Sequence, residues 1–378
     1  MKIRERVIEE FTNQFKNSPD HIVRAPGRVN LIGGHTDYND GFVLPMAIDH
    51  SIWIALRPRR DRRVLLRSLQ FNSSADFSLD NIQHTKGWQG YVQGIAWVLQ
   101  KNKFEIRGWE GILSGDVPIG AGLSSSAALE LSLLKAFYAI SDYKWDGALM
   151  AKFARQADNE WVGVQSGIMD QMISALAKKN HAMLIDCRSL STKFVPLPKK
   201  TNVIVLDTST RRGLVDSEYN DRVNQCKVAA QHFGYSSLRD VSLESFKTES
   251  DKLGNISLKR ANHVINENQR TLDASEAMLN NDPLTLGDLM NLSHRSLEED
   301  YEVSTKELNV IAKIARSQEG CYGARMTGAG FGGCAVALVQ EEYSEIFQYN
   351  VCKQYHDQIG LDPNIYICKA SAGAEVCA

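Results

Sequence analysis

The sequence predicts a protein of the α+β or α/β class, in which helices and strands interleave. Short apolar runs bounded by turn residues open the chain, helical spacing begins near residue 87, and strand-like runs return between the helices. The chain has 378 residues, well above the ~100–200 residues of an ordinary domain. We therefore expect two domains.

The first half begins with an amphipathic helix at residues 1–15. Strands are predicted for FVLPMAI, SIWIALRP and RRVLLRSL, which are residues 42–48, 51–58 and 62–69. From residue 87 the apolar residues recur on one helical face as far as Leu99.

Residues 108–118 return to a strand pattern, and a glycine- and serine-rich turn follows them. A long helix comes next, with an apolar stripe that includes Leu129, Leu133 and Phe137. This order of elements suits either of the two mixed classes.

The second half begins near the loop LPKKT, which separates the strand-like runs MLIDCRS and NVIVLD. We place the domain boundary there, with domains at residues 1–195 and 196–378. Polar-apolar helices dominate residues 215–318, and residues 324–340 read as a glycine loop that feeds an apolar strand.

Composition limits the class of protein. Apolar residues make up 43% of the chain and charged residues 23%, as in soluble globular proteins, and the net charge of −2 provides no field for nucleic acid. No signal peptide and no run of eighteen apolar residues is present, and the seven cysteines form no C-x-x-C pair. We expect a cytoplasmic protein with reduced thiols, without a structural zinc, and with no membrane or nucleic-acid partner.

The stretch GRVNLIGGHTDYNDG, Gly27 to Gly41, holds arginine, asparagine, histidine, aspartate and tyrosine side chains between glycines. Such a variety of polar side chains suits a binding site better than a core.

A second stretch, VPIGAGLSSSAALE, spans Val117 to Glu130. Its glycines allow close approach of the backbone to an anion, its serines supply hydroxyls, and the following helix directs its N-terminal amides at the same place. The lysine of a G-x-x-x-x-G-K-[ST] loop is absent. The stretch therefore predicts either a phosphate cradle of another type or a glycine turn whose serines cap a helix.

A third stretch, MTGAGFGG, matches G-x-G-x-x-G, but a strand-like run follows it where a dinucleotide fingerprint requires a helix. It predicts a tight hairpin, or a second glycine loop packed against the first. In SGIMDQMISAL, Asp170 opens a helix, either as its cap or as a base held near an arginine. Together the four stretches supply the groups that phosphoryl transfer needs.

Taken together, these stretches resemble galactokinases, within the wider family of small-molecule kinases that includes homoserine, mevalonate and phosphomevalonate kinases. The resemblance covers essentially the whole chain. Its motifs are APGRVNLIG, HTDYNDGFVLP, GAGLSSSA, GIMDQ, HAMLIDCRSL, SEYN, SHRSLEEDYEV and MTGAGFGGC, in family order.

The resemblance implies an ATP-dependent kinase that phosphorylates the anomeric hydroxyl of galactose. It also implies a two-domain α+β fold with mixed sheets and helices, an active site between the domains, and a final segment that packs back near their interface. We expect a monomer whose partners are a small sugar and ATP.

Residue by residue, Asp170 matches the family's catalytic carboxylate, and Arg28 matches the arginine that works with it. A carboxylate can accept the proton of the anomeric hydroxyl while an arginine keeps that carboxylate ionised. His35, Asp37, Gly167 and Tyr219 match the family positions that contact the sugar, and Gly34 occupies a further such position with a different residue.

For ATP, the resemblance implies a phosphate loop with an aromatic residue against adenine. The matching residues are Gly120, Gly122, Ser124, Ser125, Ser126 and Trp88. Magnesium is implied by the polyphosphate, with Ser125 or Ser126 and Asp158 as ligands. Many relatives carry glutamate at the position of Asp158, so the shorter side chain is expected to reach the ion through water.

The larger departure lies in the first stretch, where galactokinases typically read G-E-H-T-D-Y and this chain has Gly34 in place of the glutamate. That glutamate resembles an acceptor for the hydroxyl at carbon 6, so its loss removes a charge-assisted hydrogen bond of roughly 1.5–3 kcal/mol.

Four explanations of Gly34 stay open. Water replaces the carboxylate in a galactokinase with a raised Michaelis constant; the substrate lacks carbon 6, as L-arabinose does; the substrate carries a carboxylate there, as galacturonic acid does; or the glycine is engineered. The motifs favour galactose. A sugar and ATP sensor without turnover is a further alternative, which the intact Arg28 and Asp170 disfavour.

Overall fold

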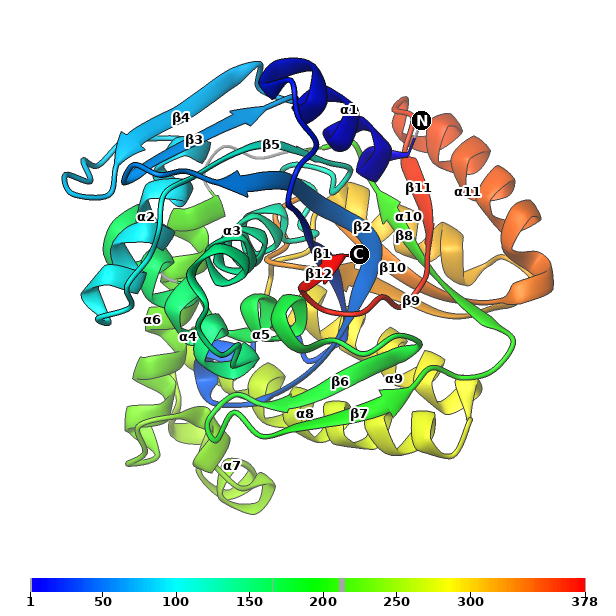
Figure 1. Cartoon of the computed structure of the whole chain (residues 1–378). Helices are drawn as coiled ribbons and strands as arrows, with labels where there is room; N and C mark the ends of the chain where they lie inside the picture. Colours follow the sequence, from blue (N-terminus) through cyan, green and yellow to red (C-terminus); the bar gives the residue numbers. More distant parts are fainter. Residues whose placement is uncertain (1, 165, 211–214, 378) are drawn as a thin grey trace.

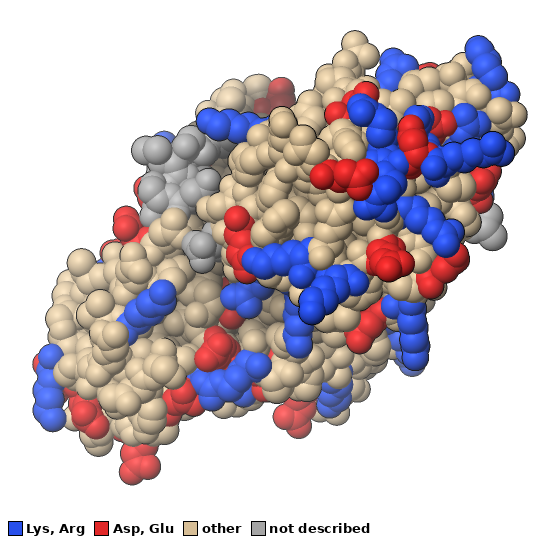
Figure 2. Space-filling model, turned by 60° about the vertical axis from the view of Figure 1, so that its left-hand side comes forward, with Lys and Arg blue, Asp and Glu red and all other residues tan. Residues whose placement is uncertain are grey.

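The computed structural model describes the backbone of residues 2–164, 166–210 and 215–377. Two β-sheets and their helices form a mixed fold, as the sequence predicts (Figure 1). Within the described residues, no helix is long and apolar enough to cross a membrane. Basic and acidic side chains lie interspersed over the face shown in Figure 2.

The larger sheet is mixed, since β3 runs parallel to β5 while its other pairs are antiparallel. Its path is β12-β1-β2-β5-β3-β4, and β6 and β7 branch from β2. Its strands are β1 (His21–Ile32), β2 (Phe42–Pro58), β3 (Arg63–Ser68), β4 (Ser73–Ser78), β5 (Trp109–Gly115), β6 (His181–Asp186), β7 (Thr192–Pro196) and β12 (Glu375–Cys377).

The strands predicted at residues 42–48 and 51–58 form one continuous strand in the structure. Strand β2 runs through both, because the Asp49-His50 pair between them carries no glycine or proline that would break the ladder. It pairs with β1 on both sides of a register shift between Pro26 and Arg28. Strands β1, β4, β7, β12 and β11 (Asn364–Cys368) were among those not predicted; β4 and β7 are short and hold few apolar residues, so their pattern is a weak signal.

The smaller sheet is antiparallel, in the order β11-β8-β10-β9. Its strands are β8 (Thr201–Asp207), β9 (Cys321–Thr327), β10 (Cys334–Gln340) and β11 (Asn364–Cys368). Successive side chains point to opposite faces, so Val203 and Val205 join the core of the larger sheet, while Ile204 and Leu206 join the core under the C-terminal helices.

The helices follow the predicted layout except that α4 and α11 were not predicted from the sequence. They are α1 (Ile3–Phe15), α2 (Trp88–Lys101), α3 (Ser125–Ser141), α4 (Gly147–Ala157), α5 (Met169–Leu176), α6 (Val215–His232), α7 (Leu243–Glu249), α8 (Asn255–Leu279), α9 (Pro283–Glu299), α10 (Lys306–Arg316) and α11 (Ser344–Ile359). The final strand, β12, pairs with residues 22–24 near the start of β1.

Two glycine loops meet where the sheets approach each other. The loop before α3 contains Gly122, and the loop that joins β9 to β10 contains Gly328. A Cβ on Gly328 would lie 3.2 Å from the carbonyl oxygen of Gly122, so the two backbones are in contact. The MTGAGFGG stretch is therefore both a hairpin connection and a second glycine loop packed on the first.

Candidate active site

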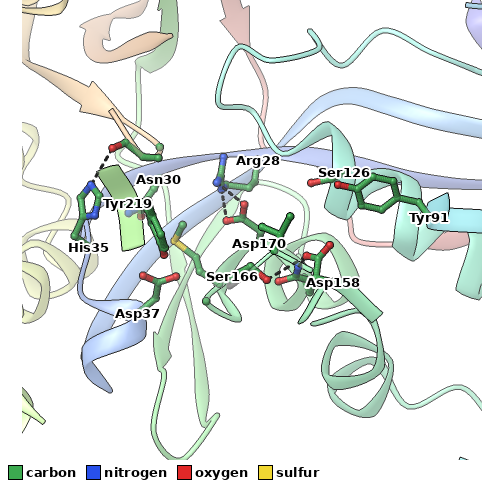
Figure 3. A pocket seen from close by; sticks show the side chains of 17 residues that line it. Arg28, Asn30, His35, Asp37, Tyr91, Ser126, Asp158, Ser166, Asp170 and Tyr219 are labelled. Atoms are coloured by element: carbon green, nitrogen blue, oxygen red, sulfur yellow. Dashed lines mark hydrogen bonds and ion pairs between the residues drawn. The ribbon is translucent and has the colours of Figure 1, made fainter. Parts of the chain in front are cut away.

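A cavity of about 220 Å³ lies between the glycine loops, the end of β1 and the start of α5 (Figure 3). Nine of the predicted site residues line it: Arg28, Gly34, His35, Asp37, Ser126, Asp158, Gly167, Asp170 and Tyr219. Segments far apart in the sequence therefore meet around one space.

Arg28 and Asp170 form the tightest ion pair of the cavity. The arginine donates from Nε to Oδ1 at 2.6 Å and from Nη2 to Oδ2 at 2.5 Å, a bidentate geometry (Figure 3). Its Nη1 donates to the carbonyl of Gly122 at 2.6 Å, and the Ser124 hydroxyl donates to Asp170 Oδ2. Oδ1 retains acceptor capacity, since a carboxylate oxygen has about two lone-pair sites and Oδ1 accepts only from Arg28, whereas Oδ2 accepts two hydrogen bonds.

Local sequence explains why this pair forms. Asp170 is the second residue of α5, where a carboxylate is favoured by the helix dipole. Arg28 lies on β1 beside the register shift, and its side chain is buried. Asp170 is therefore not the cap of α5, since Ile168 occupies that position; it lies in the first turn of the helix and pairs with an arginine, and its role as a base stays a prediction.

Asp37 and Gly167 are in close contact. A Cβ on Gly167 would lie 1.6 Å from Oδ2 of Asp37, so a side chain at position 167 would displace the carboxylate. Burial and the nearby Asp170 charge together raise the pKa of Asp37 to about 6, although a backbone hydrogen bond at Tyr38 and the charge of Arg28 oppose the rise. Asp37 is thus an acceptor whose charge depends on pH near neutrality.

His35 is held by a chain of hydrogen bonds. Its Nε2 lies 3.2 Å from the carbonyl of Ala329, which can only accept, and its Nδ1 lies 2.8 Å from the hydroxyl of Tyr38. Tyr38 is bonded in turn to Tyr301 at 2.7 Å. Burial lowers the pKa of His35 to about 3, so the ring is neutral and both of its nitrogens are occupied.

Tyr219 packs its ring against His35 and Tyr38, with centroids 5.9 and 5.0 Å apart. The rings of His35 and Tyr219 form one wall of the cavity on the side of Asp37 (Figure 3), and Tyr38 packs against both without lining the cavity.

At the other end, Asp158 lies in a short π-helical turn, Asp158–Val162, at the end of α4. Its Oδ2 accepts from Gln171 Nε2 at 2.9 Å and from the Ser166 hydroxyl at 3.1 Å. Glu130 of α3 is fully buried beside it, and burial and the neighbouring Asp158 raise the pKa of Glu130 well above its ordinary value. Its Oε1 has no hydrogen-bond partner within the described part of the chain.

The remaining predicted residues lie outside the cavity lining. Gly120, Gly122, Ser124 and Ser125 belong to the loop that precedes or begins α3, and Ser126 alone of that loop lines the cavity. Trp88 stacks on Phe71 with ring centroids 6.0 Å apart, and its indole nitrogen donates to Ser73. Tyr91, one turn along α2, lines the cavity instead (Figure 3).

Several lining residues were not singled out from the sequence. Tyr91, Ser166 and Gln171 are among them, and Glu130 supports the lining from behind. Glu130 left a signal, because a carboxylate inside the apolar stripe of SSAALELSLL indicates a buried partner. Gln171 left none, since a polar residue in the first turn of a helix is common.

Comparisons with known proteins agree with this geometry. Residues 9–58 match the galactokinase galactose-binding signature, residues 90–178 the GHMP kinase N-terminal domain, and residues 274–357 the GHMP kinase C-terminal model. The galactokinase of Lactococcus lactis, solved with galactose, is 33% identical, with a TM-score of 0.95 over 99% of this chain and 100% of that one. The mevalonate kinase of Methanococcus jannaschii, at 20% identity and a TM-score of 0.68 over 93% and 99%, shares the fold.

Proposed function

The chain belongs to the galactokinase family of GHMP kinases, and on this premise we propose that it transfers the γ-phosphoryl group of ATP to the anomeric hydroxyl of D-galactose. The observation that carries the proposal is the bidentate Arg28–Asp170 pair, in one cavity with Asp37 and against the glycine loop.

Asp170 accepts the proton of the anomeric hydroxyl. The freed oxygen bonds to the γ-phosphorus, the bond from that phosphorus to the β–γ bridging oxygen breaks, and ADP leaves. Arg28 holds the carboxylate ionised and oriented, and Ser124 fixes the oxygen that Arg28 Nη2 also contacts. Positioning contributes as much as proton removal, since the transition state for phosphoryl transfer is loose.

The sugar lies, in this proposal, between Asp37 and the ring wall. Asp37 accepts from two adjacent hydroxyls, and Gly167 leaves the room that this carboxylate needs. Because both ring nitrogens of His35 are occupied, we assign it the role of holding loop 328–333 and shaping the wall.

The nucleotide's phosphates lie along residues 120–126, whose glycines at 120 and 122 have φ values of 69° and 77°. Trp88 is retained as a candidate at the adenine end, and Tyr91 joins it because it lines the cavity.

The residues around Asp158 fit a magnesium ion. Ser126 and Asp158 offer oxygen donors to the cavity, and the Oε1 atom of Glu130 behind them lacks a partner among the described residues. Ser126 and Asp158 would hold the ion, with Ser125 as the alternative serine. Bound Mg²⁺ supplies neutralisation of polyphosphate charge.

A sugar panel tests the proposal. Initial rates with ATP are measured for galactose, L-arabinose, galacturonate, galactosamine and glucose, and phosphorus NMR identifies the position of the new phosphate. We expect galactose 1-phosphate as the principal product. A product phosphorylated at another hydroxyl, or ATP binding without turnover of any sugar, would contradict the proposal.

A second candidate substrate class is a galacto-configured sugar that differs from galactose at carbon 6. Gly34 favours it, because the family's glutamate is missing from the cavity wall at that position.

A further inference from the structure

The cavity wall at Gly34 is backed by a buried arginine. Arg325 of β9 is only 1% exposed, and a Cβ added to Gly34 would lie 2.5 Å from its Nη2 atom. Gly34 itself lines the cavity. A single glycine therefore separates the guanidinium from whatever binds there.

The charge of Arg325 is poorly compensated. Its nearest carboxylate oxygen is Oε1 of Glu267, at 3.9 Å, its Nη1 donates to the carbonyl of Asn30 at 3.3 Å, and its Nε has no partner among the described residues. The pKa of Arg325 is lowered to about 10 by burial, which leaves the group charged at neutral pH.

Glu267 is already committed to other groups. It pairs with Arg270 at 2.7 Å, accepts from the amides of Gly33 and Gly34 at 3.0 and 3.1 Å, and accepts from the Ser293 hydroxyl. Two guanidinium groups thus share one carboxylate.

The neighbouring histidines do not change this balance. His263 donates from Nε2 to the carbonyl of Gly34 at 2.9 Å, and its Nδ1 lies 3.0 Å from the hydroxyl of Ser296. Burial lowers the pKa of His263 to about 4 and that of His294 to about 3. Both are neutral at pH 7, so the cluster of Glu267, Arg270 and Arg325 carries one excess positive charge.

A glutamate at position 34 would neutralise that charge, and this chain lacks it. An uncompensated buried charge is costly, so an anionic group that enters the cavity at Gly34 is favoured. The acidic groups that line the cavity are Asp170, which Arg28 neutralises, Asp158, which lies at the proposed magnesium end, and Asp37, which binds sugar hydroxyls in the proposed pose. Arg325 does not itself line the cavity, so it would attract an anion at the Gly34 wall from behind the glycine, with Asp37 as the main repulsive neighbour.

We propose that Arg325 determines specificity at the Gly34 wall, and that the kinase accepts as a second substrate a galacto-configured sugar acid with its carboxylate at carbon 6. The inference rests on the proposed function, which places carbon 6 at residue 34. The reaction is the same: the anomeric O–H loses its proton to Asp170, its oxygen bonds to the γ-phosphorus, and ADP leaves.

The test compares kcat/KM for galacturonate and galactose in the wild type and in Arg325→Met, Arg325→Lys and Gly34→Glu. We expect the wild type to phosphorylate galacturonate. Arg325→Met and Gly34→Glu should each lower the ratio of galacturonate to galactose at least tenfold, whereas Arg325→Lys, which keeps the charge, should lower it less than threefold. For 6-deoxygalactose, which is neutral at carbon 6, the ratio of kcat/KM to that of galactose should not fall in Arg325→Met as it does for galacturonate.

A wild type that turns over galactose but neither phosphorylates nor binds galacturonate overturns this inference and leaves the proposed function standing. Equal ratios in the wild type, Arg325→Met and Gly34→Glu overturn it as well. If Arg325→Met does not fold, Gly34→Glu and Arg325→Lys decide the matter. If no sugar turns over, the proposed function fails, and galacturonate binding by calorimetry in the same variants still tests the charge argument.

Discussion

The two ends of the cavity wall differ in how their charges are matched. At the reacting end, Arg28 and Asp170 neutralise each other through two short hydrogen bonds, and Ser124 adds a third. At the Gly34 end, Arg325 has only a shared carboxylate at 3.9 Å. The chain therefore keeps the family's groups at the proposed place of phosphoryl transfer and departs from them at the proposed place of sugar selection.

The largest effect on activity should come from removing the charge of Asp170 in its pair with Arg28. Asp170→Asn keeps the shape but loses the proton acceptor, so we expect kcat to fall by about 10²–10⁴. Initial rates with galactose measure this. ATP binding by calorimetry and the thermal unfolding midpoint serve as controls and should change little. Turnover near the wild-type value would show that Asp170 is not the base.

Gly167→Ala tests the contact beside Asp37. The added Cβ would lie 1.6 Å from Oδ2 of Asp37, so the carboxylate must move and the KM for galactose should rise at least tenfold. Gly254→Ala is the matched control, because nothing lies within 4 Å of a Cβ there and the backbone is unstrained. If both variants keep the wild-type KM, Asp37 does not bind the sugar in the proposed way.

Gly34→Glu should give Arg325 a carboxylate partner, as Asp170 is for Arg28. The carboxylate gains Arg325 as a partner and gives the carbon 6 hydroxyl an acceptor, so the KM for galactose should fall about tenfold. The KM for 6-deoxygalactose should not fall. A Cβ at position 34 would clash with Nη2 of Arg325, but this atom is the end of a flexible side chain, which can shift. An unchanged KM for galactose would show that carbon 6 is not read at this position.

The smallest effect concerns pH. The pKa of Asp37 is raised to about 6, so it is protonated below that pH and loses acceptor capacity for the sugar hydroxyls. The KM for galactose should fall several-fold as the pH rises from 5 to 7. A KM that is flat over this range would mean that the ionised form is not required.

The same raised pKa has a consequence for stability. Between pH 4 and 6 the folded protein holds a proton on Asp37 that the unfolded chain has released, so this group makes stability fall as the pH rises through that window. Above pH 6 Asp37 is ionised in both states, and its destabilising contribution to the free energy of unfolding no longer changes with pH. Unfolding midpoints of the wild type and Asp37→Asn over pH 4–7 measure the difference.

Most of the fold was predictable from pattern. The helix from Trp88, the long helix after Ser124 and the apolar strand after the second glycine loop follow from local periodicity, which is strong over long segments. The division of β2 into two strands was wrong, because local pattern cannot show that β1 supports pairing along the whole length.

The site was predictable in part. The motifs drew attention to Arg28, Asp37, Asp158 and Asp170, and the structure brings their side chains to one cavity. Whether each performs its assigned role stays a prediction. Tyr91 and Gln171 lie on helical faces that look like ordinary core or surface, so their place at the cavity needed the packing of α2 and α5.

By itself, the sequence determined the mixed class, the glycine loops and the absence of a glutamate at position 34, because these depend on residue identity and short-range spacing. Only the tertiary structure decided what stands behind Gly34. Arg325 is 291 residues further along the chain, by the difference of 325 and 34, and only the packing of β9 against the end of β1 places its charge there. Long-range electrostatics depend on distance in space, which the sequence does not contain.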